Sequence, residues 1–199
     1  MAKIRSALEI ALERTESVKS DKGSIGQFEA KQKGKKLAND FLEGNVKSLE
    51  EEIKKEAGGK ANEGLAASLK QGVFDVLISR INLPAVKDDL KMIEAAGRGL
   101  HAIIGGKQFG EIVKQMVQIM NQYLEEAAQF DQAIKRQYAP KLRQKEEELS
   151  RRLGRAVQLD PFQDPEFVAF YNQNMNSLKS NYQTAVDQVR EEAVRLFGV

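Results

Sequence analysis

The chain has 199 residues, of which 31 are Lys or Arg and 29 are Asp or Glu, leaving a net charge of +2. That balance argues against a strongly basic nucleic-acid clamp and against an acidic tail. The absence of cysteine excludes disulfides, thiolate zinc sites and cysteine nucleophiles, and the single histidine, His101, excludes a multi-histidine metal centre.

Strong helix formers dominate the first 106 residues, and the pattern predicts about five helices there. The first is expected over residues 3–19, with an apolar face formed by Ile4, Leu8, Ala11 and Val18. The second is expected to start at a Ser24 cap and to run toward Gly44. Its apolar members are Phe28, Leu37 and Phe41.

The next three predicted helices are marked by their ends. Asn45 is expected to cap the third helix, which Gly58 and Gly59 end. The fourth is expected over residues 62–81. Pro84 is placed in the first turn of the fifth, which ends at Gly105–Gly106.

The last ninety residues predict two much longer helices. Apolar residues recur at three- and four-residue steps through Ile112, Met116, Ile119, Tyr123, Ala127, Phe130, Ile134 and Tyr138, as in the seam of one long helix. Pro140 should bend this helix, because proline lacks an N–H and crowds the preceding turn. The seam then resumes and ends at Gly154.

A second long helix should begin at Asp164–Pro165, a cap followed by proline at the first helical position. Two long helices joined by a short connection should pack antiparallel, because neither can bury its apolar stripe alone. The sequence therefore predicts an all-α fold, an elongated helical bundle with a long antiparallel C-terminal hairpin bent at Pro140. The expected division is residues 1–106 and 107–199, packed together as one unit.

No apolar run approaches the roughly 18 residues of a membrane-spanning helix. Glu9 and Glu13 interrupt any apolar core of a signal peptide at the N-terminus. These features favour a cytoplasmic protein.

Residues Gly97–Ala102 match the loose pattern G-x-G-x-x-A of dinucleotide-binding turns. Such a turn needs a strand before it, whereas the residues upstream of Gly97 predict helix, so close helix packing or a helix break is the better interpretation. His101 lies among apolar residues and has no acidic residue three or four positions away, which favours a packed structural role. We therefore expect no cofactor and no metal site.

The acidic triplets Glu50–Glu52 and Glu146–Glu148 are each followed by basic residues at spacings that form ion pairs on one helix face. Solvated helix faces explain them better than paired catalytic carboxylates. With no catalytic constellation in the sequence, we expect that the chain is not an enzyme.

The connection between the two long helices carries four apolar residues near a turn fixed by Pro161 and Pro165. They are Val157, Leu159, Phe162 and Phe167. Exposed at the end of a hairpin, they would form a contact surface for a partner. The better interpretation is that they fold back to close the end of the hairpin, or contact the N-terminal helices, because apolar residues in loops usually pack locally.

Basic residues also cluster around the expected bend and beyond it. They are Lys141, Arg143, Lys145, Arg151, Arg152 and Arg155. Residues 140–199 nevertheless carry 9 basic and 9 acidic side chains, and residues 1–60 carry 13 and 11. Neither end has the excess of positive charge that drives nucleic-acid binding by counterion release.

The sequence thus favours a non-enzymatic helical interaction or scaffold protein that binds a protein partner, which can be a second copy of itself. The alternative is an RNA- or ribosome-associated helical protein that uses the basic helix faces.

Overall fold

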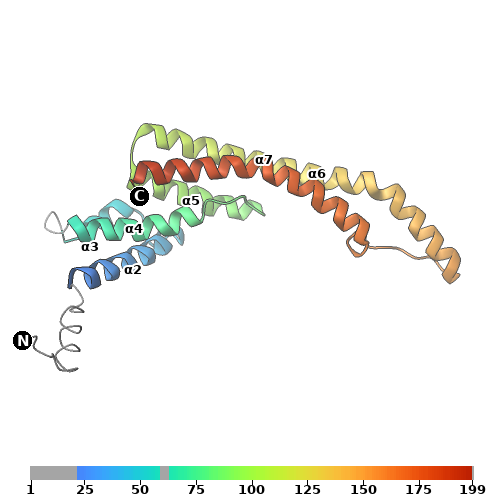
Figure 1. Cartoon of the computed structure of the whole chain (residues 1–199), viewed down its shortest axis with the longest axis horizontal. Helices are drawn as coiled ribbons and strands as arrows, with labels where there is room; N and C mark the ends of the chain where they lie inside the picture. Colours follow the sequence, from blue (N-terminus) through green and yellow to red (C-terminus); the bar gives the residue numbers. More distant parts are fainter. Residues whose placement is uncertain (1–21, 59–62, 199) are drawn as a thin grey trace, which may run out of the picture. The chain divides into compact units, whose positions relative to one another are not determined.

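The computed structural model describes residues 22–58 and 63–198 of the chain. Within those residues it contains six α-helices, one short 3₁₀ turn and no strand, which confirms the predicted all-α fold (Figure 1). The predicted helix over residues 3–19 lies outside the described residues. The chain divides into two compact units, residues 1–79 and 80–199.

The first unit is built from α2 (Lys22–Leu42), α3 (Leu49–Glu56) and α4 (Glu63–Ser79). Glycines let α2 and α4 approach each other backbone to backbone. A Cβ atom placed on Gly34 would lie 2.1 Å from the carbonyl oxygen of Leu69, and one on Gly72 would lie 2.0 Å from that of Lys31. Both positions therefore require glycine, because backbone atoms cannot move aside as a flexible side chain can.

The face of α2 that packs on α4 differs from the predicted one. Small residues form it, including Ala30 and Ala38, which are buried, whereas Phe28 is exposed. A stripe of glycine and alanine carries little hydrophobic signal, so the sequence pattern pointed to the large side chains instead.

The helix starts in this unit also differ from the sequence prediction. Helix α2 already runs at Lys22, so Ser24 lies inside the helix. Ser48 rather than Asn45 caps α3, because its Oγ accepts a hydrogen bond from the backbone N–H of Glu51. The predicted stop of α3 at Gly58 agrees with the positive φ of 68° found there.

The second unit consists of α5 (Lys87–Ile104), α6 (Lys107–Leu153), the 3₁₀ turn η1 (Pro161–Gln163) and α7 (Pro165–Phe197). Helix α5 starts three residues after Pro84, which is buried in the preceding segment and not in the first turn of the helix. Asp89 stabilises the N-terminus of α5, since its carboxylate accepts hydrogen bonds from the backbone N–H groups of Ala85 and Val86 at 2.7 and 3.0 Å.

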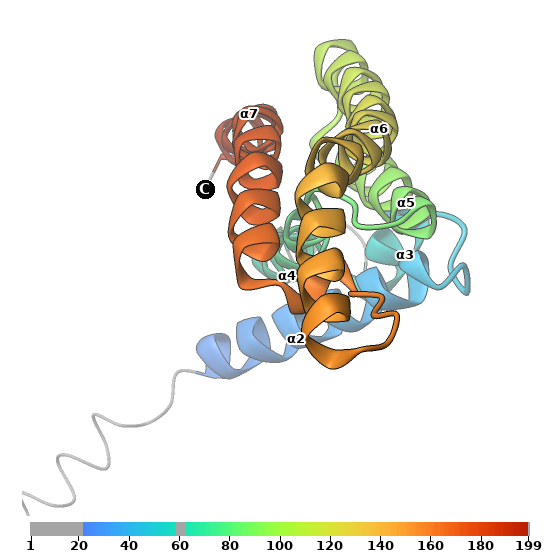
Figure 2. The same ribbon diagram turned by 90° about the vertical axis from the view of Figure 1, so that its right-hand side faces the viewer.

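Helices α6 and α7 form the predicted antiparallel hairpin, and α5 packs against both (Figures 1 and 2). Helix α6 is continuous through Pro140, and at 1.5 Å per residue its 47 residues span about 70 Å. It changes direction in the yellow-to-orange part of the ribbon, the part of the chain that contains Pro140. Seam residues such as Met116, Tyr123, Ile134 and Tyr138 are buried as predicted.

The contacts place the boundary between the two units after Ser79, whereas the sequence pattern put it after Gly106. The difference arises because α5 belongs with the hairpin. A Cβ atom on Gly97 of α5 would come within 2.7 Å of Val113 and 3.3 Å of Met116, both on α6.

Replacing Gly34 with Ala tests the close approach of α2 and α4. We expect Gly34→Ala to destabilise the first unit by about 2 kcal/mol or more, because the new methyl group meets a backbone carbonyl. Gly26→Ala is the matched control in the same helix, since its Cβ would meet only a side-chain atom of Leu65 at 3.6 Å. Urea unfolding followed by circular dichroism measures both, and equal stability of the two variants would contradict the close packing.

Candidate functional site

The candidate site lies where α6 leads into α7, and we call it the hairpin end: residues 138–153 of α6, the connection 154–164 and the first turn of α7, 165–167. The connection folds back along the last turns of α6. Its backbone N–H groups at Val157 and Leu159 donate to Ser150 Oγ at 2.9 Å and to the Glu146 carboxylate at 2.8 Å. The end of α6 therefore extends past the beginning of α7 (Figure 1).

The carboxylate of Asp164 is the centre of a polar network in the hairpin end. Asp164 is 8% exposed and caps α7 by accepting from the backbone N–H of Glu166 at 3.1 Å. It also accepts from the hydroxyl of Tyr138 at 3.0 Å and from the ammonium of Lys145 at 2.7 and 2.9 Å. Lys145 and Lys141 both reach the carboxylate of Glu166, at 2.8 and 2.9 Å.

These contacts shift the pKa values of the charged groups away from neutrality. Hydrogen bonds from Lys145, and then from Lys141, lower the pKa of Glu166 to about 2. The hydrogen bond from Lys145 also lowers the pKa of Asp164, and its bonds to Asp164 and Glu166 raise the pKa of Lys145. A general acid or base works best with a pKa near the working pH. The shifted pKa values therefore favour a structural role for these charged groups over proton transfer near pH 7.

An aromatic cluster lies directly beside this network. Phe167 is fully buried, with its ring centroid 5.1 Å from Tyr138 and 5.2 Å from Phe162, both in edge-to-face contact. Tyr171 contacts Phe162 at 5.3 Å, and its hydroxyl donates to Asp131 at 2.9 Å. The cluster joins α6, η1 and the first two turns of α7 into one packed element.

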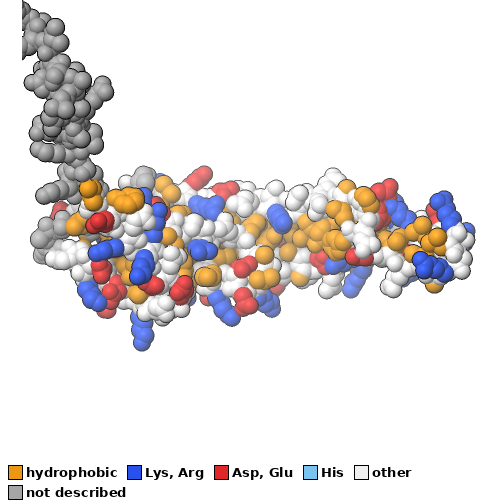
Figure 3. Space-filling model, turned by 90° about the horizontal axis from the view of Figure 1, so that it is seen from below, with side chains coloured by type: hydrophobic (Ala, Val, Ile, Leu, Met, Phe, Trp, Pro, Cys, Tyr) orange, Lys and Arg blue, Asp and Glu red, His pale blue; other side chains and the backbone are white. Residues whose placement is uncertain are grey.

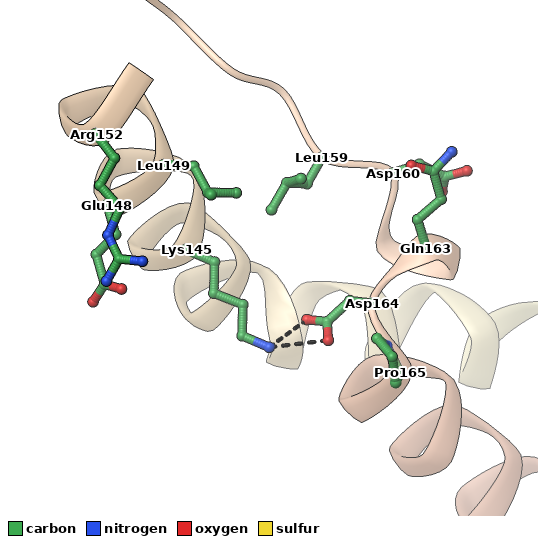
Figure 4. Close-up of a pocket in the computed structure, with 9 residues that line it drawn as sticks. All are labelled: Lys145, Glu148, Leu149, Arg152, Leu159, Asp160, Gln163, Asp164 and Pro165. Atoms are coloured by element: carbon green, nitrogen blue, oxygen red, sulfur yellow. Dashed lines mark hydrogen bonds and ion pairs between the residues drawn. The ribbon is translucent and has the colours of Figure 1, made fainter. Parts of the chain in front are cut away.

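A pocket of about 340 Å³ lies between the end of α6 and the connection. Figure 4 shows Leu149 of α6 and Leu159 of the connection pointing toward one another across it. The ion pair of Lys145 and Asp164 closes one side, and Arg152 lies on the other. The pocket thus combines an apolar interior with a charged rim.

The four apolar residues expected at a contact surface differ in how far they are buried. Phe167 is buried in the aromatic cluster, and Phe162 packs on that cluster although its side chain is 49% exposed. Val157 and Leu159 are half-buried against the end of α6. Leu153, on the last turn of α6, is 56% exposed and was not among the residues selected from the sequence.

The basic residues also fall into two groups. Lys141 and Lys145 hold the start of α7, and Arg151 pairs with Glu147 at 3.7 Å. Arg143, Arg152 and Arg155 are exposed and form no ion pair within the described part of the chain. Figure 3 shows Lys and Arg side chains bordering hydrophobic ones at this end of the hairpin.

Tyr138, Asp164 and Glu166 form one network in the structure, but no local sequence pattern marks them as a site. Asp164 was recognisable as a helix cap, and Tyr138 as a seam residue. Their contact spans 26 residues along the chain, and no local spacing rule reports a contact of that range.

The glycine motif, His101 and the acidic triplets all have structural explanations. Residues 97–102 lie inside α5, where Gly97 meets α6, so they do not form a strand-to-helix turn. The ring of His101 is exposed, with Nε2 3.2 Å from the carbonyl oxygen of Gly106, and it packs on Gly110. In the acidic triplets, Glu52 pairs with Lys55 and Glu147 with Arg151.

Over the described ranges, 22–58 and 63–198, no three His, Asp or Glu side chains lie close enough together to hold a metal ion. In the same ranges, no helix combines the length and the apolar composition needed to cross a membrane.

A family model described as a family of unknown function, DUF6657, matches residues 55–195. The chain belongs to this family. The matched region contains α4, α5, α6 and α7 up to residue 195, so it includes the hairpin end, whereas α2 precedes the match. The comparisons with curated proteins and with solved structures give no match.

Replacing Asp164 with Asn tests the network. Asparagine keeps a capping oxygen but loses the charge that pairs with Lys145, so we expect Asp164→Asn to cost about 1–3 kcal/mol of unfolding free energy. Asp160→Asn is the matched control, because Asp160 caps η1 on an exposed carboxylate and should change stability by less than about 0.5 kcal/mol. Chemical unfolding of both variants measures the difference, and a silent Asp164→Asn would refute the network.

The same network predicts how stability depends on pH. Asp164 and Glu166 bind protons less readily in the folded state, so their contribution is complete above their ordinary pKa values, 3.8 and 4.5. It is lost as the pH falls through the folded values, about 2 for Glu166. Unfolding free energy measured from pH 5 to pH 2 should therefore fall less steeply for the double variant Asp164→Asn, Glu166→Gln than for the natural chain. Parallel curves would exclude this role.

Proposed function

We propose that this member of the DUF6657 family is a non-enzymatic interaction protein that binds a protein partner, or a second copy of itself, through the hairpin end. The observation that carries the proposal is the combination of exposed Leu153, half-buried Leu149 and Leu159, and three arginines that form no ion pair with any described residue. Apolar side chains bordered by arginine are typical of the centre and rim of protein interfaces.

Rigidity of the hairpin end supports the same proposal. The Asp164 network and the aromatic cluster fix the connection against α6, so little conformational freedom remains to be lost when a partner binds. A surface that is ordered before binding keeps more of its contact energy as affinity.

RNA binding is the second candidate, and it is favoured by the three arginines that have no ion-pair partner in the described part of the chain. Lys141 and Lys145 are poor residues for testing it, because reversing their charge would break the start of α7. Arg143, Arg152 and Arg155 are the informative set, since electrostatic binding to phosphates would fall steeply with salt and with each charge removed.

A photo-crosslinking amino acid at position 153 tests the proposal in cells that make the protein naturally. We expect one protein species, or a second copy of the chain, to crosslink at position 153. It should not crosslink at position 92, where Met92, an exposed apolar residue as well, lies on α5.

The affinity of that species for purified protein should then fall roughly tenfold or more with Leu153→Glu. The free energy of unfolding should stay within about 0.5 kcal/mol, because Leu153 is exposed. Crosslinks to RNA at position 153 that disappear with Arg143→Ser, Arg152→Ser and Arg155→Ser would favour the second candidate. Equal crosslinking at positions 153 and 92 would contradict the proposal.

A further inference from the structure

A second pocket lies on the side of the hairpin, away from the residues of the hairpin end. It has a volume of about 470 Å³ and is formed by the segment 82–85, α6 and α7. Helix α7 contributes Asn176, Lys179, Ser180 and Gln183, whose spacing places them on one helix face. Pockets of about 300–1,000 Å³ are the size that small-molecule ligands occupy.

Tyr123 gives this pocket a hydroxyl group that has no hydrogen-bond partner among the described residues. Tyr123 lines the pocket, is 5% exposed, and makes no side-chain hydrogen bond within the described residues. Its ring packs against Tyr182 at 5.2 Å, and burial alone raises its pKa. Among the described residues its oxygen is not one of the buried side-chain atoms that lack a hydrogen-bond partner, so it is open to solvent, and a ligand in the pocket would take the place of water there.

The other walls define the chemistry of that ligand. Lys179 is the one charged residue among the described residues that line the pocket, and the neighbouring amides and hydroxyls both donate and accept hydrogen bonds. Leu83, the buried Pro84 and the ring of Tyr123 provide apolar surface in the same pocket. The segment 82–85 is tied to α7, since Arg190 donates to the side-chain oxygen of Asn82 at 2.6 Å.

We propose that this pocket binds a small carboxylic acid that carries hydrogen-bonding groups next to the carboxylate and an apolar side chain. The carboxylate pairs with Lys179, the polar groups reach Tyr123 and the amides of α7, and the apolar part lies against Pro84. An amino acid and the C-terminus of a peptide share this chemistry. The site is separate from the hairpin end and does not depend on the function proposed there.

Nuclear magnetic resonance of ring-labelled tyrosine tests the site, because the chain has only four tyrosines. The probes are N-acetyl-leucine, which resembles a peptide C-terminus, leucine, and N-acetyl-leucinamide, which lacks the charge. We expect N-acetyl-leucine or leucine to shift the Tyr123 signal while Tyr138 and Tyr171 stay unchanged. Tighter binding of N-acetyl-leucine would identify the natural ligand as a peptide C-terminus. Tighter binding of leucine would identify it as a free amino acid.

Lys179→Gln should weaken binding of the charged probe roughly tenfold, by loss of a charge-assisted hydrogen bond. Tyr123→Phe keeps the ring contact with Tyr182 and should weaken binding severalfold. Lys107→Gln is the matched control, since Lys107 is an exposed lysine on α6 outside this pocket. The proposal is wrong if neither acid shifts Tyr123, if N-acetyl-leucinamide binds as well as N-acetyl-leucine, or if Lys107→Gln weakens binding as much as Lys179→Gln.

Discussion

The carboxylate of Asp164 joins the two long helices at one defined position. It caps α7 by accepting a hydrogen bond from the backbone N–H of Glu166, and its other donors, Tyr138 and Lys145, come from α6. A buried carboxylate is costly unless donors surround it, so α7 can begin only where these groups meet it. That position places Phe167 against Tyr138 and leaves the last turns of α6 covered by the connection alone. The pocket and the exposed Leu153 of the hairpin end follow from it.

The sequence predicted the elements that local rules govern. Gly154 ends α6 with a φ of 65°, and Asp164–Pro165 opens α7, as the cap residues indicated. The three- and four-residue steps of the seam predicted the burial of Met116, Tyr123, Ile134 and Tyr138, whereas Phe130 of the same seam is 36% exposed. The prediction was less accurate in the first unit, because the α2–α4 contact depends on the absence of side chains at Gly34 and Gly72. Hydrophobic periodicity does not report such a contact.

The candidate site was predictable only in part, for a related reason. The sequence identified the connection and the basic residues around it, but it gave Lys141 and Lys145 the same role as Arg143, Arg152 and Arg155. Which cations are neutralised depends on carboxylates that lie 19 to 25 residues away, brought near by the hairpin. The side pocket has the same origin, since Pro84, Tyr123 and Lys179 come from three separate parts of the chain.

Pro140 shows how the hairpin tolerates a residue that breaks most helices. Proline cannot donate to the carbonyl four residues earlier, which belongs to Arg136, but both residues are exposed, so water can satisfy that carbonyl. A helix bends away from the side on which its proline lies, and Figure 1 shows α6 and α7 curving in the same direction in this region. The bend therefore keeps the seam of α6 on α7 as far as Leu142, and the contacts of Tyr138 and Lys145 with Asp164 are made across the bent segment. Leu142 and Lys145 lie beyond Pro140 in α6 and still contact the packed start of α7, so the proline does not interrupt the pairing of the two helices.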